Sequence, residues 1–496
     1  MKALDVVILF VYLAGIVWFG SSFYRKNRTS VDFTLGSNKL PAWVLSLSIF
    51  ATYVSSISYL AIPGQAYSTN WNAFAFSVSL PLATWMSVKY FVPLYRSVGS
   101  PSAYTYLEIR FGKWARIYAS SMYLLTQLMR TGTILYLMAM MLHVITGWNI
   151  AAIILVTGLS VTIYAVAGGL QAVVWTDAVQ GIILVAGALV SAGVLLFSMP
   201  EGPGQLFSLA IEHHKFSLGT LGPELDRPTF WVVLIYGIAI NLQNYGIDQN
   251  YVQRYMAAGS DKDARNSVLY GGLLYIPVSM IFLFIGTALF SYYKANPGLL
   301  PAGISGDKVF PYFIVNGLPA GLTGLLIASV FAAGMSTVST SINSSATIIL
   351  NDYMKKPASG NPNERSAMRI LFTASLMFSL LGILVAFAMI DVQYALDSWW
   401  KLASVFSGGM LGLFLLGYFT KHIGNCAAMA GVGAGVLLIG WMSLSPVFLS
   451  HGPMQHLESP FHGYLSIVFG TMAIFLVGFL AGILINQIKK LNINSV

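Results

Sequence analysis

Apolar runs of about 20 residues, separated by short polar turns, follow one another along almost the whole chain. A helix of that length crosses the hydrocarbon core of a bilayer. We therefore predict an all-α integral membrane protein with thirteen transmembrane helices. The predicted spans are residues 5–24, 41–66, 71–94, 117–146, 149–168, 172–198, 229–254, 267–292, 319–350, 368–390, 395–419, 425–446 and 463–487. Because thirteen is odd, the two ends of the chain should lie on opposite sides of the membrane.

Two of these spans are interrupted by residues that membrane helices seldom tolerate. The second span contains three serines and then Pro63-Gly64, which predicts unpaired backbone carbonyls near residues 51–56. The seventh span is polar over residues 241–250, with Gly246 inside the polar stretch. Both segments should therefore be broken helices whose free backbone groups lie within the membrane.

Spans two to six and seven to eleven form two blocks of five, and an interrupted helix opens each block. Because five is odd, the second block is inverted relative to the first, as in transporters whose broken helices meet near the midplane. The predicted domains are an extra helix and loop at 1–40, a first repeat at 41–198, an outer loop at 199–228, a second repeat at 229–419, and two additional helices with a tail at 420–496. Polar kinks in a channel or an enzyme pore would give a similar pattern.

Composition and charge support a membrane protein and set its orientation. Hydrophobic residues make up 56% of the chain and charged residues only 9%, and the mean hydropathy is +0.73, which excludes a water-soluble globule of this length. With the N-terminus outside, 18 of the 26 lysines and arginines, Arg254 among them, fall in inward loops. The positive-inside rule therefore predicts an outer N-terminus and an inner C-terminus. The net charge of +9 then reflects topology rather than nucleic-acid binding.

Oxygen-bearing side chains line one helical face of the ninth span, at positions i, i+3, i+4 and i+7. They are Ser336, Ser339, Thr340 and Asn343, with Thr337 beside them. Hydroxyl and carbonyl oxygens are hard donors that suit a small hard cation such as sodium. Serines in membrane helices also serve as packing residues that bond to their own backbone, so both interpretations stay open.

Charged residues inside predicted spans need a function or a partner, because each costs roughly 2.5–3.5 kcal/mol at the centre of a membrane helix. Arg130 lies in the fourth span without an acidic neighbour at i±3 or i±4, so it should meet an anionic substrate or pair with a distant acid. Asp177 either sits at a favourable helix start or supplies the formal charge of a cation site with the hydroxyl stripe. Asp248 should cap or bond the break in the seventh span.

Three segments resemble the signature segments of the solute:sodium symporter family. They are residues 168–180, residues 247–258, and residues 336–343 followed by Asn351-Asp352, in the family's order. The likeness covers nearly the whole chain and implies the LeuT-like inverted-repeat fold with extra flanking helices. Within the family, the combination of Arg130 with Ser55, Ser58 and residues 247–254 is most similar to the bacterial sialic acid transporters.

The resemblance also implies which residues bind the ions and the substrate. The main sodium site would use the carbonyls of Ala51, Val54 and Ala333 and the side chains of Ser336 and Thr337. A second sodium site would comprise Asp177, Ser336, Ser339 and Thr340. The substrate would contact Ser55, Ser58, Ser77, Gln127, Arg130, Asn241 and Asn244, with Arg130 on its carboxylate. The chain departs from the branch at Ser77, Ala73 and Tyr53.

These observations predict a sodium-coupled symporter that imports a carboxylated sugar, above all sialic acid, with two sodium ions per substrate, and not an enzyme. A symporter of a neutral sugar or another small solute is the alternative, and a passive channel or a membrane sensor is a more distant one. The sequence contains no G-x-x-x-x-G-K-[ST] segment, which disfavours a nucleotide-driven pump. We expect Na⁺ as the coupling ion, the lipid bilayer but no nucleic acid as a partner, and a monomer in a bacterial cytoplasmic membrane.

Overall fold

A computed structural model of the chain describes residues 2–354, 363–390, 408–449 and 454–494. These residues are mostly helical. Among them there is no β-strand, only an isolated β-bridge between Leu40 and Ala258. The helices of the first half are α1 (Ala3–Ser21), η1 (Ser22–Lys26), α2 (Ser30–Leu35), η2 (Gly36–Asn38), α3 (Ala42–Tyr53), α4 (Ser56–Ser68), η3 (Trp71–Ala73), α5 (Phe74–Val78), α6 (Leu80–Met86), η4 (Ser87–Phe91), α7 (Val92–Val98), α8 (Thr105–Phe111), α9 (Lys113–Thr146), α10 (Ile150–Phe197) and α11 (Pro203–Glu212). The helices of the second half are α12 (Phe230–Ile247), α13 (Gln249–Ala257), α14 (Asp261–Leu273), α15 (Tyr275–Ala295), α16 (Gly306–Asn316), α17 (Leu322–Ile348), η5 (Ile349–Met354), α18 (Glu364–Ala388), α20 (Met410–Phe419), α21 (Asn425–Phe448), η6 (Gln455–Leu457) and α22 (Leu465–Asn494).

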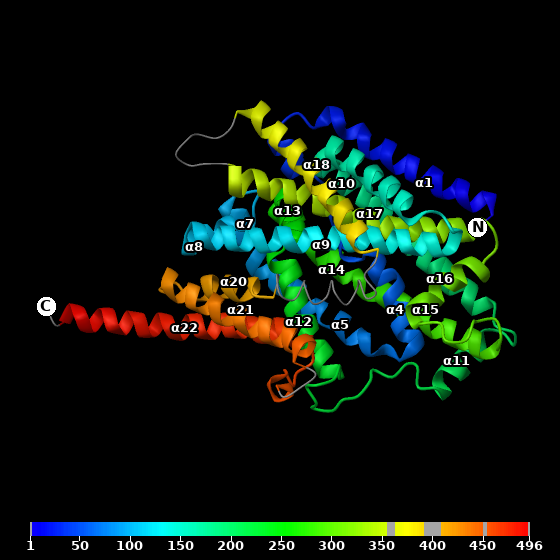
Figure 1. Ribbon diagram of the computed structural model, residues 1–496. Helices are drawn as coiled ribbons and strands as arrows, with labels where there is room; N and C mark the ends of the chain where they lie inside the picture. The colour runs from blue at the N-terminus through cyan, green and yellow to red at the C-terminus, as the bar shows by residue number, and fades with distance from the viewer. Residues whose placement is uncertain (1, 355–362, 391–407, 450–453, 495–496) are drawn as a thin grey trace.

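Within the described residues, nine helices are long and apolar enough to cross a membrane, or ten if the bent pair α3–α4 counts as one span. The all-helical membrane architecture is therefore confirmed, whereas the number thirteen stays a prediction. The predicted span 71–94 is divided into short α, 3₁₀ and π segments. The predicted span 395–419 lies largely outside the described residues. The ends of the described chain lie on opposite sides of the molecule, where α1 begins and α22 ends (Figure 1).

The fifth and sixth predicted spans form one 48-residue helix, α10, with a kink at Gly169. Gly169 has φ 56° and ψ −157°, a conformation that residues with a side chain rarely adopt. A Cβ at this position would also lie 2.9 Å from the Cα of Phe33. The glycine thus lets α2 pack directly against the kink, which explains the glycine pair at the start of the first signature segment.

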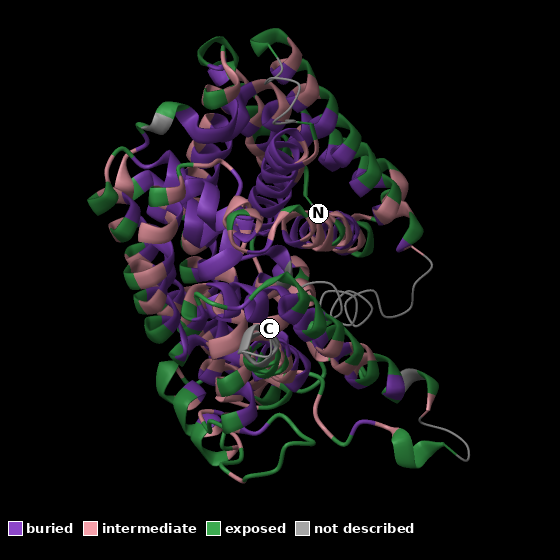
Figure 2. Cartoon of the chain, turned by 90° about the vertical axis from the view of Figure 1, so that its left-hand side faces the viewer, coloured by how far each residue is buried: buried purple, intermediate pink, exposed green. Residues whose placement is uncertain are grey.

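The helix with the hydroxyl stripe, α17, lies at the centre of the molecule. It packs against α10, α9, α1, α18 and α3, and nearly every residue from Leu326 to Ile348 is buried. Figure 2 shows the buried residues concentrated in this interior and the exposed ones on the outer helices. The stripe of Ser336, Ser339, Thr340 and Asn343 therefore faces protein on all sides and not lipid.

Both predicted helix breaks are confirmed. In the second span, α3 ends at Tyr53, and Val54 and Ser55 have extended backbones before α4 begins, with a bend of 56°. The break precedes Pro63, which lies inside α4. In the seventh span, α12 and α13 are separated by the extended residue Asp248. The first break brings the Ala51 carbonyl beside α17, and at the second the carbonyls of Tyr245 and Gly246 accept hydrogen bonds from buried hydroxyls.

Candidate functional site

The break between α3 and α4 exposes backbone oxygens toward α17. The carbonyls in the last turn of a helix have no backbone N–H donors from a following turn. The chain becomes extended at Val54, so the carbonyls at the end of α3 are left in this state. The carbonyl of Ala51 accepts a hydrogen bond of 3.0 Å from the Ser336 hydroxyl, and the carbonyl of Thr52 accepts one of 3.4 Å from Arg130. The interrupted helix therefore contacts both α17 and α9 through its freed carbonyls.

Four of the five residues predicted for the main sodium site come together at this point. The Ser336 hydroxyl lies 3.0 Å from the Ala51 carbonyl and 3.1 Å from the Ala333 carbonyl. The Thr337 hydroxyl lies 3.2 Å from the same Ala333 carbonyl, and Val54 is buried in the break itself. Each hydroxyl oxygen has two lone pairs, so it can turn from a carbonyl toward a cation. The result is a buried cluster of hard oxygen ligands that joins two helices far apart in the sequence.

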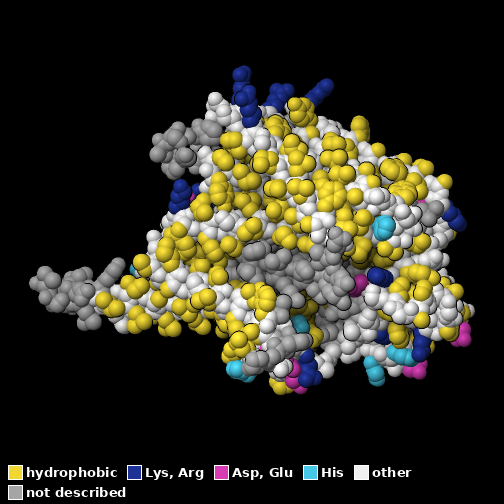
Figure 3. All heavy atoms as spheres, in the orientation of Figure 1, with side chains coloured by type: hydrophobic (Ala, Val, Ile, Leu, Met, Phe, Trp, Pro, Cys, Tyr) yellow, Lys and Arg dark blue, Asp and Glu magenta, His cyan; other side chains and the backbone are white. Residues whose placement is uncertain are grey.

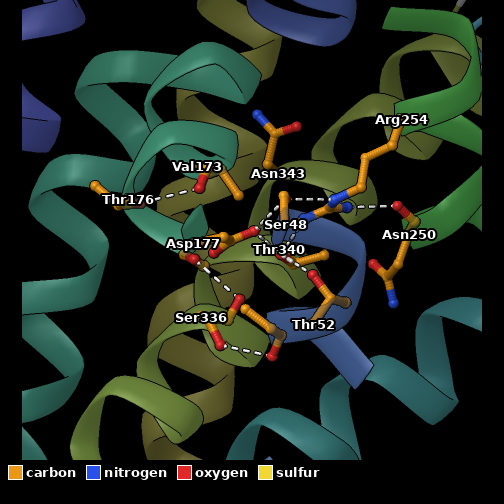
Figure 4. A network of polar contacts seen from close by, with 12 residues as sticks. Ser48, Thr52, Val173, Thr176, Asp177, Asn250, Arg254, Ser336, Thr340 and Asn343 are labelled. Carbon is orange, nitrogen blue, oxygen red and sulfur yellow. Dashed lines mark hydrogen bonds and ion pairs between the residues drawn. The ribbon is translucent and has the colours of Figure 1, made fainter. Parts of the chain in front are cut away.

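Asp177 forms a second buried cluster, in which Figure 4 shows it facing residues from three other helices. Its Oδ2 accepts hydrogen bonds from Ser48 of α3 at 2.7 Å, from Thr340 of α17 at 3.3 Å and from Arg254 of α13 at 2.7 Å. Both Asp177 and Arg254 are fully buried. Among the described residues, Oδ1 of Asp177 has no hydrogen-bond partner. The site thus holds an ion pair and one carboxylate oxygen that can accept a further ligand.

Two features of this arrangement bear on the predicted second sodium site, which stays a prediction. Of the predicted hydroxyl partners of Asp177, Thr340 contacts the carboxylate. The Ser336 hydroxyl donates to the carbonyls of Ala51 and Ala333 instead. The Ser339 hydroxyl donates to the carbonyl of Ser336. Moreover, the negative charge of Asp177 is already balanced by Arg254. A carboxylate in the interior needs such a counter-charge because an unpaired ion there costs several kcal/mol. The dipole interpretation is also unsuitable, because Asp177 lies eight residues beyond the kink of α10 and the effect fades within the first turn.

Arg254 is the buried partner of Asp177 that the sequence interpretation missed. The charge count places it among the inward loops, yet all nine residues of α13 are buried. Besides Asp177, its guanidinium donates to the hydroxyls of Ser48 and Thr340, both at 2.7 Å, and to the carbonyl of Asn250. The signal that could have found it is the need of Asp177 for a buried cation.

A cavity of about 300 Å³ lies next to the α3–α4 break, between α4, α5, α9, α12 and α15. That volume is at the lower end of the range of small-molecule sites. Six of the seven predicted substrate contacts line it, together with all three positions that depart from the sialic acid branch. The six are Ser55, Ser58, Ser77, Gln127, Arg130 and Asn244, and the departing positions are Tyr53, Ala73 and again Ser77.

Asn241 does not line the cavity. It is fully buried behind the wall, where its side chain accepts from the Tyr53 hydroxyl and donates to the Ser79 hydroxyl at 2.8 Å. Tyr53 itself lines the cavity and packs against Tyr245, with a distance of 5.6 Å between the ring centroids. Asn241 therefore positions a wall residue and does not face the cavity.

The cavity contains both a cation and a carboxylate. Among the described residues, no acidic side chain lies within ion-pair distance of Arg130, and the acid that shares the cavity with it is Asp248. It accepts a hydrogen bond of 2.8 Å from the backbone of Asn250 and so caps α13, which confirms its predicted role at the break. The cavity can therefore bind a carboxylate at Arg130 and hydrogen-bond donors at Asp248.

The chain also matches known proteins in sequence. A sequence model of the Sodium:solute symporter family matches residues 33–435. The chain is 30% identical to the sodium/sialic acid symporter SiaT of Proteus mirabilis, over 99% of this chain and 97% of that protein. It is 29% identical to the sodium/sialic acid symporter NanT of Aliivibrio fischeri, over 99% and 94%.

Solved structures show the same fold. The chain matches a substrate-bound outward-open structure of a Na⁺-coupled sialic acid symporter with a TM-score of 0.89 and 27% identity, over 97% of this chain and 98% of that one. Mhp1, a nucleobase-cation-symport-1 family transporter, matches with a TM-score of 0.58 and 16% identity over 89% and 92%, a likeness of fold alone.

Proposed function

Because the chain belongs to the sodium:solute symporter family, we propose that it uses a sodium gradient to import a carboxylated sugar, with sialic acid as the preferred substrate. The observation that carries this proposal is Arg130, which lines a 300 Å³ cavity directly beside the oxygen cluster at the α3–α4 break. A planar guanidinium matches a carboxylate with two parallel hydrogen bonds. The relatives named for sodium and sialic acid transport support the same substrate.

The residues around the break give this chain a route for coupling. Sodium at the carbonyls of Ala51, Val54 and Ala333 and the hydroxyls of Ser336 and Thr337 would hold the broken helix against α17. Ser55 and Ser58 lie just beyond the same break and line the cavity, so ordering of the break by the ion also orders the substrate contacts. Ion and substrate then favour the same conformation, and each raises the affinity for the other.

A second sodium ion would bind at the free Oδ1 of Asp177, with Ser336, Ser339 and Thr340 as the remaining ligands. Two sodium ions with one monoanionic substrate transfer one net charge. A tenfold sodium gradient contributes about 1.4 kcal/mol per ion and 100 mV contributes about 2.3 kcal/mol per charge, or about 5 kcal/mol in all. That free energy supports accumulation of roughly a few thousandfold, against about tenfold for an electroneutral cycle with one ion.

The proposal includes the topology in which this cycle would operate. Thirteen transmembrane helices would place the N-terminus outside and the C-terminus inside a bacterial cytoplasmic membrane, and the blocks 41–198 and 229–419 would be inverted repeats. The positive-inside distribution of lysine and arginine supports the orientation. The bacterial relatives support the location. We propose that one copy of the chain is the transporting unit.

One observation favours a neutral sugar as the rival substrate. The carboxylate of Asp248 lines the cavity and can accept hydrogen bonds from sugar hydroxyls whether or not the sugar has a carboxylate. Uptake of labelled sialic acid into proteoliposomes, with unlabelled hexose and proline as competitors, separates the two. We expect uptake only with an inward sodium gradient and no competition by hexose or proline. Sodium-independent uptake would point to a channel, and strong competition by hexose would point to the neutral-sugar symporter.

A further inference from the structure

Outside the transport site, the structure has a hollow of about 580 Å³ between η1, at the end of α1, and the first turns of α18. Two arginines come from each side: Arg25 in η1 and Arg28 just after it, and Arg365 and Arg369 on α18. Figure 3 shows the lysine and arginine side chains projecting from this edge of the molecule, above the helices where Figure 1 places the start of α18. Residues 340 positions apart thus form one basic hollow.

The four arginines have no acidic partner in the described part of the chain. All four are exposed, and none takes part in the five ion pairs found there. The carboxylate in the hollow, Glu364, accepts a hydrogen bond from the backbone of Ser30. Four positive side chains and one negative one leave a net charge of +3 in the hollow. Its arginines are therefore available to an external anion.

The hollow lies where the lipid-facing surface of two helices ends. Trp18 on α1 and Leu376 on α18 are 75% and 46% exposed, as expected for residues that face lipid. Arg369 precedes Leu376 by seven residues, or about 10 Å along a helix, and Arg25 follows Trp18 by the same number. Aromatic and apolar side chains, from Tyr24 and Phe372, share the hollow with the arginines. The arginines thus lie at the level of lipid headgroups, beside apolar surface.

We propose that this hollow binds the headgroup of an anionic phospholipid, with the phosphate on the arginines and the acyl chains along α1 and α18. Arginine binds phosphate through two parallel hydrogen bonds, and basic pockets between membrane helices are suited to anionic headgroups. A dissolved phosphate offers the same anion but gains nothing from the adjacent lipid-facing surface. The hollow therefore discriminates in favour of the lipid. The proposal does not depend on what the transporter carries.

The test is a titration of the purified protein in a neutral detergent with short-chain phosphatidylglycerol, phosphatidylcholine or inorganic phosphate, with bound molecules counted by native mass spectrometry. We expect saturable binding of phosphatidylglycerol and much weaker binding of the other two. Each arginine near the surface contributes roughly fivefold in affinity. The variant R365Q/R369Q should therefore bind phosphatidylglycerol roughly 30-fold more weakly, and R25Q/R28Q should show a similar loss from the other element.

The matched control is K262Q/R265Q, which removes two exposed positive charges from α14 and should leave the affinity unchanged. An equal loss in the control would show that the lipid responds to overall charge and would overturn the proposal. Unchanged affinity in both R365Q/R369Q and R25Q/R28Q would overturn it as well. Binding of inorganic phosphate as tight as that of phosphatidylglycerol would overturn the assignment to a lipid headgroup.

Discussion

Arg130 gives the sharpest prediction, because its guanidinium is the cationic group of the cavity and has only a weak contact of its own. Its one hydrogen bond within the described residues goes to the Thr52 carbonyl at 3.4 Å, so most of its donors are free for a substrate. A hydrogen bond to a charged group contributes about 1.5–3 kcal/mol, or about 10- to 150-fold in affinity. Arg130→Gln keeps a polar side chain of moderate size but removes the charge and the paired donors.

The assay is sodium-driven uptake into proteoliposomes, with sialic acid compared with its methyl ester. In the wild type, the half-saturating concentration of the ester should exceed that of the acid by about 10- to 150-fold, because the ester cannot form the charged pair. In Arg130→Gln the acid should become as poor a substrate as the ester, while the ester itself changes little. Arg130→Ala should abolish measurable uptake of the acid. Equal losses for acid and ester in Arg130→Gln, or unchanged uptake of the acid, would refute the assignment of Arg130 to the carboxylate.

Three further predictions concern the two ion clusters. Asp177→Ala should lower the Hill coefficient for sodium in uptake toward one, and a coefficient that stays near two would exclude a second coupled ion at this residue. Thr337→Ala removes one hydroxyl ligand and should raise the sodium concentration needed for half-maximal uptake; unaltered sodium affinity would count against the main site. Arg254→Gln leaves the buried Asp177 carboxylate without its cation, at a cost of about 3–5 kcal/mol, so the apparent melting temperature in detergent should fall. The double variant with Asp177→Asn should recover much of that loss, and a purely additive loss would show that the pair does not act as a unit.

Local sequence patterns predicted the two helix breaks and the buried hydroxyl stripe correctly. Val54 and Ser55 leave the helical conformation where the sequence has consecutive polar residues ahead of Pro63. The stripe on α17 follows the helical period, so the same side chains that the sequence places on one face all lie in the interior. Both features depend on residues close together in the chain, which is why a single sequence was sufficient.

Contacts between distant segments were predicted less well. The sequence predicts a loop position for Arg254, because a count of positive charges cannot tell a solvated arginine from one that is ion-paired inside the protein. The sequence predicts that Asn241 touches the substrate, but the residues of α12 that line the cavity are Val233, Tyr236, Ile240, Gln243, Asn244 and Ile247. Asn241 lies one residue beyond Ile240 and therefore about 100° around the helix. The sequence thus identifies Asn241 as a polar residue of the interior, but its side chain points away from the cavity.

The central claim is that sodium binds the oxygen cluster between the α3–α4 break and α17 and thereby prepares the cavity for substrate. Its most direct test is the affinity of the purified protein for sialic acid, measured by calorimetry in sodium chloride and in N-methylglucamine chloride. In the wild type, sodium should raise the affinity by at least about tenfold, within the usual range of coupling between sites. In Ser336→Ala, which removes a hydroxyl that contacts both the Ala51 and the Ala333 carbonyls, this sodium effect should vanish while the affinity without sodium is kept. Equal wild-type affinity in the two salts, or a full sodium effect in Ser336→Ala, would contradict the account.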